Sequence, residues 1–529
     1  MNLLVPTLVL IPLISAGITL LSPRNRLFQQ TVTAGALISI AVISVILMIQ
    51  VDIEGALSIS VGGWAAPFGI ALVVDRISAI LVGVSALVLL GVYYFSAGQG
   101  LADGDKEAPL SIYAPTYLVL GAGVNNAFIA GDLFNLYVGF EILLVASYVL
   151  ITLGGTAQRI NAGIIYIVVS LLSSILFLTT IGLIYGATGT VNMADLSLKL
   201  GDIDASLYTS LNILLLVAFG IKAAVFPLAF WLPDSYPTAP APVTAVFAGL
   251  LTKVGVYAII RTQTLLFRES ELNTLLAVLA AITMVVGILG AVAQLDIKRM
   301  LSFVLVSHIG YLIFGIAIDT EAGYSATTFY IVHHIVVQTT LFIAVGLIER
   351  RAATTSLIQL GGLLKIAPLV AVITFLPLLN LGGIPPFSGF IGKVALFEAA
   401  TAKTGTLMYL LMGVGAFVSL VTLYVLARAW AIAFWRPMAE AKVDYDADRF
   451  AHLQSSPEIE TNNDPRNIPR IMTGAAVFMV ILSLSLTVFA GPLYAYASRA
   501  GANLADPQQY IEKVLGGTDG GSKVGDNGE

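Results

Sequence analysis

The sequence lacks cysteine altogether and has few charged residues. None of its 529 residues is a cysteine, which excludes disulfides, thiolate-ligated iron–sulfur clusters, cysteine nucleophiles and cysteine-type zinc sites on this chain. Charged side chains make up 11 % of the residues, whereas soluble domains carry roughly 25 %. The net charge of −5 is small for this length, so the composition does not indicate nucleic-acid binding or a basic surface for anionic lipids.

Sequence motifs of cofactor and metal enzymes are also missing. The chain has no GxxxxGK[ST] phosphate-binding loop, no GxGxxG between a strand and a helix, and no HExxH or carboxylate cluster. We therefore expect neither a cofactor nor a catalytic metal on this chain, and no enzymatic reaction of its own.

Hydrophobic runs long enough to cross a bilayer, ~20 residues each, recur along nearly the whole chain. With 58 % hydrophobic residues, they predict an all-α polytopic membrane protein of about fourteen transmembrane helices. The first run has no basic region before it and no small-residue cleavage site after it, so we expect it to be the first helix of the mature chain. The expected spans are residues 3–21, 29–50, 72–95, 110–130, 132–153, 161–185, 207–231, 240–263, 272–293, 300–317, 325–348, 366–400, 405–434 and 471–497.

The spans fall into groups that indicate an internal repeat. Two consecutive groups of five spans each contain a helix interrupted by proline, and because five is odd, the two groups must point in opposite directions through the bilayer. Inverted repeats of this kind are typical of ion transporters. The expected domains are N-terminal helices 1–109, a first five-helix repeat 110–265, a second five-helix repeat 266–435, a polar cytoplasmic loop 436–470, a C-terminal helix 471–498 and a polar, partly disordered tail 499–529.

Basic residues alternate between loops and predict the orientation. Lysine and arginine accumulate in cytoplasmic loops, and one alternating set of loops holds most of them, whereas the other holds more acidic residues. This pattern places both termini on the outer side of a cell membrane. The basic set comprises Arg24, Arg26, Lys106, Arg159, Lys298, Arg299, Arg350, Arg351, Lys365 and the segment 436–470.

Ionisable residues lie deep inside several spans, although each costs about 2.5 to 3.5 kcal/mol at the bilayer centre. Glu141, Lys222 and Lys253 lie so far from the span ends that snorkelling to water is the weaker explanation. Lys393, accompanied by Glu398, lies nearer a helix end. We therefore expect interior functional sites at these lysines and at Glu141.

Three of the four histidines also lie within spans. For His308 and His333, a packed and hydrogen-bonded core histidine is an equally good interpretation, whereas His334 is a candidate site residue. Burial destabilises the charged form of a lysine and a nearby carboxylate restores it, so glutamate, lysines and histidines on neighbouring helices are the components of a proton relay. By contrast, Asp132 and the pair Asp75 and Arg76 lie near span ends, where pairing at the interface is expected.

Two of the expected spans are interrupted by proline close to a lysine. Pro227 cannot donate to the carbonyl of Ala223, beside Lys222, and the five prolines between residues 227 and 242 end that helix. Asp234 in this stretch is expected to cap a turn. In LGGIPPFSG, Pro385 and Pro386 break the span 366–400 ahead of Lys393. Freed carbonyls at this depth indicate contact with protein or water, so the first break predicts a wet cavity. The two broken helices, each with a lysine, form a pair.

At these residues the sequence resembles the antiporter-like subunits shared by Mrp-type multisubunit sodium/proton antiporters and respiratory complex I. The resemblance covers roughly residues 70–435 and is closest to the D subunits of the Mrp group. It rests on FNLYVGFEILLVASYVLI at 134–151, FGIKAAVFPLAFWLPDSYPTAPAP at 219–242, GLLTKVGVYAIIR at 249–261 and GGIPPFSGFIGK at 382–393.

The resemblance implies roles for the buried residues. Glu141 would modulate Lys222 in the first half-channel, Lys253 would be the central relay, and Lys393 would be the exit lysine of the second half-channel. His334 matches the family histidine of the second half. The sequence departs from the family four residues later, where Gln338 replaces a frequent lysine. The central link would therefore either run through His334 and water or be tuned for different gating.

The resemblance also implies partners and leaves two functions open. The chain would work in a hetero-oligomer with the other Mrp antiporter subunits, namely the large homologous A subunit and the small membrane subunits B, C, E, F and G. This assembly would export Na⁺ or another monovalent cation in exchange for H⁺. The alternative is a proton-pumping subunit in the membrane arm of a complex I-like oxidoreductase.

A third possibility is a non-conducting scaffold, which would predict apolar residues in place of the buried lysines. The acidic segment 437–469 could dock a partner or could be a solvated loop.

Overall fold

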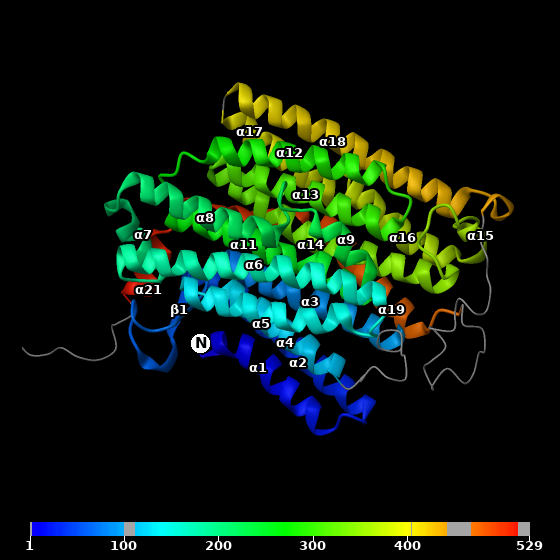
Figure 1. Cartoon of the computed structure of the whole chain (residues 1–529), viewed down its shortest axis with the longest axis horizontal. Helices are drawn as coiled ribbons and strands as arrows, with labels where there is room; N and C mark the ends of the chain where they lie inside the picture. Colours follow the sequence, from blue (N-terminus) through cyan, green and yellow to red (C-terminus); the bar gives the residue numbers. More distant parts are fainter. Residues whose placement is uncertain (1–2, 100–111, 404, 442–466, 517–529) are drawn as a thin grey trace, which may run out of the picture.

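Long helices that run side by side dominate the computed structural model, which describes residues 3–99, 112–403, 405–441 and 467–516 (Figure 1). Lys106, most of the segment 437–469 and the end of the tail lie outside the described residues. Twelve helical segments in the described part are long and apolar enough to cross a membrane. They are α1 (Leu4–Leu21), α2 (Arg26–Glu54), α3 (Arg76–Gln99), α5 (Leu133–Thr152), α6 (Ala157–Thr188), α8 (Ala205–Ala223), the continuous segment Ala241–Leu266, α12 (Asn273–Val292), α13 (Ile297–Ile318), α14 (Glu321–Ala352), the segment Thr406–Trp435 and α19 (Arg470–Val488).

Two of these segments combine several helix types, and shorter elements complete the chain. Ala241–Leu266 comprises α10 (Ala241–Val246), the π-helix η5 (Phe247–Leu251), α11 (Thr252–Arg261) and the π-helix η6 (Thr262–Leu266), while Thr406–Trp435 comprises α18 (Thr406–Trp430) and η7 (Ala431–Trp435). The shorter elements are β1 (Leu57–Ser60), η1 (Val61–Gly63), β2 (Ala71–Val74), α4 (Tyr113–Ile129), α7 (Met193–Lys199), η3 (Leu200–Asp202), α9 (Trp231–Ser235), η4 (Tyr236–Thr238), α15 (Leu363–Ile366), α16 (Pro368–Gly382), α17 (Ser388–Ala402), η8 (Met438–Glu440), α20 (Ala490–Ala505) and α21 (Gln508–Leu515).

This architecture confirms a mostly helical, multi-pass membrane protein. Helices suit the bilayer because they satisfy their own backbone hydrogen bonds. The predicted break in span 366–400 is also present: α16 ends at Gly382 and α17 begins at Ser388. The span predicted at 207–231 is wrong for residues 224–230, because α8 ends at Ala223 and the chain does not return to helix until Trp231.

A small β-hairpin and a terminal helix were not expected. Strands β1 and β2 pair antiparallel, so the predicted span 72–95 begins as a strand and becomes helical only at Arg76. The last predicted helix continues as α20 to Ala505, and α21 forms within the segment expected to be a polar tail. Tyr510, Ile511 and Val514 bury one face of α21, which supplies the packing that composition alone did not indicate.

The connections divide into two faces at opposite ends of the helices (Figure 1). The hairpin face carries the β-hairpin, α7 and α21, where the Arg499 guanidinium meets the Asp52 carboxylate at 2.7 Å. The α15 face carries α15 and the beginning of α13. On this face the Ile297 N–H donates to the Thr355 carbonyl at 3.0 Å and Arg350 donates to the carbonyl of Asn467.

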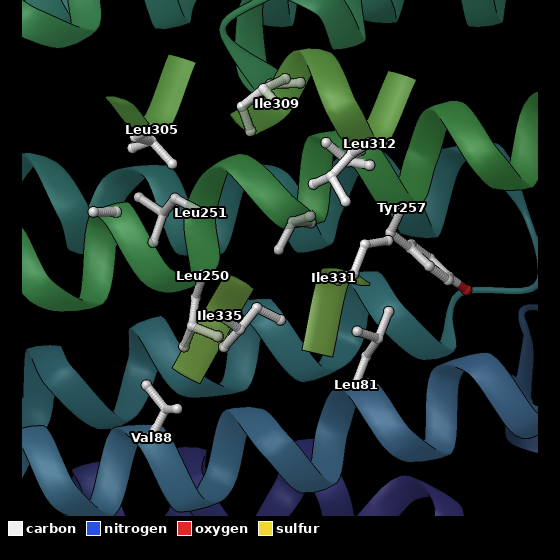
Figure 2. Close-up of a cluster of buried hydrophobic side chains, with 14 of the residues drawn as sticks. Leu81, Val88, Leu250, Leu251, Tyr257, Leu305, Ile309, Leu312, Ile331 and Ile335 are labelled. Atoms are coloured by element: carbon white, nitrogen blue, oxygen red, sulfur yellow. The ribbon is translucent and has the colours of Figure 1, made fainter. Parts of the chain in front are cut away.

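The core lies around the segment Ala241–Leu266, which is buried along its whole length. Apolar side chains from α3, α13 and α14 pack against η5 and α11 (Figure 2). This core holds the central helix of the candidate site in a fixed position between neighbours that come from both halves of the chain. The residues labelled in Figure 2 are Leu81, Val88, Leu250, Leu251, Tyr257, Leu305, Ile309, Leu312, Ile331 and Ile335.

Candidate functional site

The broken end of α8 positions Lys222 inside the protein. Ala224 adopts a left-handed conformation that ends the helix, three residues before Pro227. The indole N–H of Trp231 donates to the Ile221 carbonyl at 3.1 Å, so one of the last carbonyls of the helix finds a side-chain partner. Lys222 itself is 8 % exposed, and snorkelling to water is therefore excluded as the explanation for this lysine.

The Lys222 amine has one hydrogen-bond partner and one aromatic neighbour in the described residues. Its Nζ donates to the Ser174 Oγ at 3.2 Å and lies 4.8 Å from the centre of the Phe140 ring. Next to it is a cavity of about 20 Å³, which is room for about one water molecule. A neutral hydroxyl and a ring do not neutralise an ammonium group, so the surroundings of Lys222 allow both its charged and its neutral form. Tyr166, Ser170, Trp231 and Tyr236 are among the residues that line this cavity.

Glu141 on α5 lies within electrostatic range of Lys222, but no ion pair joins the two in the described structure. The Glu141 Oε1 atom is buried and has no hydrogen-bond partner among the described residues. Tyr137 and Tyr148 also lie within range of its charge. The carboxylate can therefore act on the lysine through space without holding it in a fixed contact.

Lys253 lies at the centre of the core, just after the π-helix η5. It is 0 % exposed, and its Nζ donates to the Ala248 carbonyl at 2.5 Å. The wider turn of a π-helix changes which carbonyls are paired along the helix, so the amine finds an acceptor on its own helix. Gly255 brings α11 directly against the broken α8, since a Cβ atom there would lie 2.7 Å from the Ala223 nitrogen and 3.0 Å from the Lys222 carbonyl carbon.

The three histidines within spans form one cluster with Tyr330. The rings of His308 and His334 stack with their centres 5.1 Å apart, and the ring of His333 lies 5.3 Å from that of Tyr330. His308 and His334 are both within electrostatic range of Lys253 and of Lys393. The cluster thus lies between the two lysines.

His334 differs from its neighbours because neither of its ring nitrogens has a hydrogen-bond partner among the described residues. His308 Nδ1 is joined to the Tyr330 hydroxyl at 3.1 Å, and His333 Nδ1 to the Ser388 hydroxyl at 2.9 Å. Buried polar atoms are otherwise paired with protein or water. A packed, hydrogen-bonded core histidine therefore describes one ring nitrogen of His308 and one of His333, but neither ring nitrogen of His334.

Lys393 lies on α17, immediately after the second break. It is 4 % exposed, and its Nζ donates to the Ser419 Oγ at 3.0 Å and lies 5.2 Å from the centre of the Tyr311 ring. Lys393 therefore has the same type of surroundings as Lys222, with one hydroxyl and one aromatic ring. The two lysines next to the two breaks form a matched pair, as the sequence indicated, whereas Glu398 is exposed.

Asn380 holds the break between α16 and α17 together. Its Oδ1 accepts from the Ser388 hydroxyl at 3.1 Å and from the Gly389 N–H at 2.9 Å, while its Nδ2 donates to the Ser483 Oγ at 3.1 Å. A serine hydroxyl has one proton to donate, so His333 must donate from Nδ1 to Ser388. This leaves the His333 Nε2 atom as a proton acceptor.

Replacing Asn380 with leucine is expected to destabilise this break, because Ser388, Gly389 and Ser483 lose their partners. Each buried polar group left unpaired costs ~1–3 kcal/mol. We expect a lower thermal stability of the purified complex together with slower transport. The matched control is Asn273→Leu, since the Asn273 amide donates to Asp319 in an exposed position; equal stability of the two variants would contradict this role of Asn380.

Gln338 lies where relatives often have lysine, and it is fully buried. Its Nε2 donates to the Leu301 carbonyl at 3.0 Å, while its Oε1 has no partner among the described residues. The amide is therefore an acceptor beside the histidine cluster and not a group that gains or loses a proton.

Several polar contacts differ from the expectation for residues near span ends. Asp75 does not pair with the adjacent Arg76: it pairs with the distant Arg261 at 2.7 Å, while Arg76 pairs with Asp52 at 2.9 Å. A helix that begins at Arg76 directs successive side chains to different faces, so adjacent residues cannot meet. Asp234 forms an exposed ion pair with Arg299 at 2.8 Å.

Asp132 is the amino-terminal cap of α5, since its Oδ1 accepts from the Asn135 N–H at 2.6 Å. Burial raises the pKa of Asp132 to about 6, although several backbone hydrogen bonds oppose the change.

In the part of the chain that the structure describes, no group of three or more His, Asp or Glu side chains is placed to hold a metal ion.

Sequence reasoning missed Ser174, Ser419 and Asn380, which contact the site from other helices. Serine and asparagine are common in membrane helices as interhelical hydrogen-bond donors, so residue type alone did not distinguish them. Their position relative to the lysines depends on helix packing, which the sequence does not specify. The position of Asn380, just ahead of LGGIPPFSG, was the one local signal available.

Comparisons with known proteins identify the family of this chain. The family described as NADH:quinone oxidoreductase/Mrp antiporter, transmembrane, matches residues 130–419. The chain is 37 % identical to the Na⁺/H⁺ antiporter D subunit of Alkalihalophilus pseudofirmus and 36 % identical to that of Bacillus subtilis, in each case over 97 % of this chain and 100 % of the relative.

Solved structures extend the likeness to the whole fold. A chain of the Mrp complex from Dietzia sp. DQ12-45-1b superposes with a TM-score of 0.88 at 32 % identity, covering 97 % of this chain and 100 % of that chain. A chain of an archaeal membrane-bound sulfane sulfur reductase gives 0.84 at 25 % identity with the same coverage. A chain of complex I from Thermus thermophilus gives 0.77 at 21 %, covering 97 % and 99 %, and shares the fold. The chain belongs to the NADH:quinone oxidoreductase/Mrp antiporter transmembrane family, in the group of the Na⁺/H⁺ antiporter D subunits.

Proposed function

We propose that this chain is the proton-conducting subunit of a multisubunit cation/proton antiporter, which exports Na⁺ or another monovalent cation in exchange for H⁺. The observation that carries the proposal is the series of ionisable groups inside the protein, from the partly buried Glu141 to the buried Lys393. Each member lies within electrostatic range of the next or is connected to it through packed helices. The series comprises Glu141, Lys222, Lys253, His334 and Lys393.

In the first half, the Glu141 carboxylate favours the charged form of Lys222 when it is ionised and near. Moving or neutralising that carboxylate lets burial expel the proton, which passes through water toward Lys253. In the second half, His334 takes the proton from Lys253 by one ring nitrogen and releases it from the other. Lys393 receives the proton at the second break. There the hydrogen bonds from Asn380 through Ser388 to His333 leave the His333 Nε2 atom free to accept a proton.

The finer architecture belongs to the same proposal. Counting α4 and the broken pair α16–α17 with the other spans gives fourteen crossings, and the two repeats 110–265 and 266–435 then run in opposite directions. The α15 face, with Arg299, Arg350 and Arg436, would be cytoplasmic in the plasma membrane. The hairpin face and both termini would then lie outside. The partners would be the large A subunit and the small subunits B, C, E, F and G.

The alternative is a proton-pumping subunit in a redox-driven complex I-like enzyme. Full-length likeness to the antiporter D subunits supports the antiporter, whereas the 21 % likeness to complex I concerns the fold alone. The test expresses the complete set of subunits in cells that lack sodium/proton antiporters and measures proton movement in everted vesicles. Movement on addition of sodium without any respiratory substrate supports the antiporter, and movement only with a reductant supports the redox enzyme.

Replacing Glu141 with glutamine is expected to slow sodium-induced proton movement about tenfold, the effect of ~1.4 kcal/mol of lost charge interaction. Glutamine keeps the shape and removes the charge that acts on Lys222. The control is Glu398→Gln, since Glu398 is exposed on α17. Equal rates for the two variants in the vesicle assay would remove Glu141 from the relay.

A further inference from the structure

The helix that carries Lys253 continues toward the hairpin face and ends in a second buried cation. Arg261 follows Lys253 by eight residues on α11, about 12 Å along the helix axis. It is 4 % exposed, and the proposed relay makes no use of it. A guanidinium stays protonated in proteins, so Arg261 cannot pass a proton onward.

Asp75 and Tyr257 fix this guanidinium in place. Arg261 Nη2 donates to the Asp75 carboxylate at 2.7 Å and to the Tyr257 hydroxyl at 3.1 Å. The Tyr257 hydroxyl in turn donates to the Phe128 carbonyl at 2.7 Å. Burial acts to raise the pKa of Asp75, but the charge of Arg261 and the hydrogen bonds from Ser78 outweigh it and hold that pKa below its usual value.

The terminal helix α21 covers the same guanidinium from the hairpin face. The Arg261 guanidinium lies 5.0 Å from the centre of the Tyr510 ring and 5.3 Å from that of Tyr257. Helix α21 packs against α7 and β1, and the Tyr510 ring is buried, although its hydroxyl has no partner among the described residues. Tyr510 therefore contributes its ring and not a hydrogen bond.

A buried ion pair of this kind is weak evidence for stability, because desolvation of the two charges offsets their attraction. A fixed arginine in a narrow polar path, by contrast, is a known barrier to protons and cations. Arg261 stands between Lys253 and the hairpin face, with aromatic rings against its guanidinium.

We propose that Asp75, Tyr257, Arg261 and Tyr510 form a seal that prevents a proton on Lys253 from leaving directly to the hairpin face. The seal directs the proton sideways to His334, so that transfer stays coupled to the second half of the chain. This inference rests on the proposed function in one respect, namely that Lys253 carries a proton. Loss of the seal would open a leak that needs no sodium.

The experiment reconstitutes the complete antiporter in liposomes, imposes a pH gradient without sodium, and follows proton leak with an internal pH dye. Arg261→Met and Tyr510→Ala are expected to raise the leak about tenfold, which corresponds to ~1.4 kcal/mol off the barrier. Tyr510→Phe keeps the ring, so its proton leak is expected to equal that of the wild type. The matched control is Arg499→Met, which removes an ion pair with Asp52 on the same face, where Arg499 is 46 % exposed.

Adding Lys253→Met to Tyr510→Ala is expected to return the leak to the wild-type level, because the leak would start from Lys253. Unchanged leak in assembled Tyr510→Ala would overturn the seal, and so would a leak that persists without Lys253. If Arg261→Met fails to assemble, Tyr510→Ala decides, since it leaves the ion pair intact. The assay contains no sodium, so failure of the antiport proposal itself would be seen separately in the vesicle experiment.

Discussion

Replacing Lys253 with methionine is expected to lower sodium-induced proton movement by about 100-fold or more, the scale on which loss of a proton-transfer group acts. Methionine has a side chain of similar length and suits a buried position. It removes the amine that, in the proposed relay, accepts and releases a proton between Lys222 and His334. Because the amine donates to its own helix at Ala248, its loss leaves one carbonyl unpaired and the packing intact. The rate is measured in everted vesicles that contain the complete antiporter.

The matched control for this prediction is Lys199→Met. Lys199 is a half-exposed lysine that pairs with Asp195 at 2.8 Å on α7, outside the proposed relay. Wild-type transport by Lys199→Met beside near-zero transport by Lys253→Met is the expected pattern. Substantial transport by an assembled Lys253→Met complex would mean that protons bypass the central helix.

The sequence was sufficient to predict the breaks in the helices and the buried charges beside them. Proline has no N–H and cannot continue a helix ladder, so LGGIPPFSG had to interrupt its span, and α16 does end at Gly382. The break predicted at Pro227 is present, but the helix ends earlier, at Ala223. The Trp231 indole N–H donates to the Ile221 carbonyl near this end. That contact joins residues ten positions apart and is invisible to a local pattern.

Other features required the three-dimensional arrangement. The β-hairpin was hidden because Ala71–Val74 is as apolar as the helix that follows it, and α21 was hidden because three buried residues among polar ones resemble a disordered tail. Asp75 lies 186 positions from its partner Arg261 in the chain, so proximity in sequence suggested Arg76 instead.

The candidate site was predicted at the level of its ionisable residues but not of their surroundings. Lysine and glutamate are conspicuous in an apolar span because their burial is costly. Their surroundings include Ser174 and Ser419, which accept from the two lysines, and Asn380 at the second break. The side chains of these three residues are ordinary in membrane helices. The roles of the ionisable residues in proton transfer stay predictions, which the Glu141, Lys222 and Lys253 variants test.

Replacing Lys222 with alanine is the most direct test of the proposed proton relay, in which Lys222 links the Glu141 charge to the other groups. The measurement is sodium-induced proton movement in everted vesicles that contain the complete antiporter, with assembly checked by purification of the complex. We expect the variant to assemble and its rate to fall to about 1 % of the wild-type rate or less, again the scale of a lost proton-transfer group. An assembled Lys222→Ala complex that matches wild type would contradict the relay.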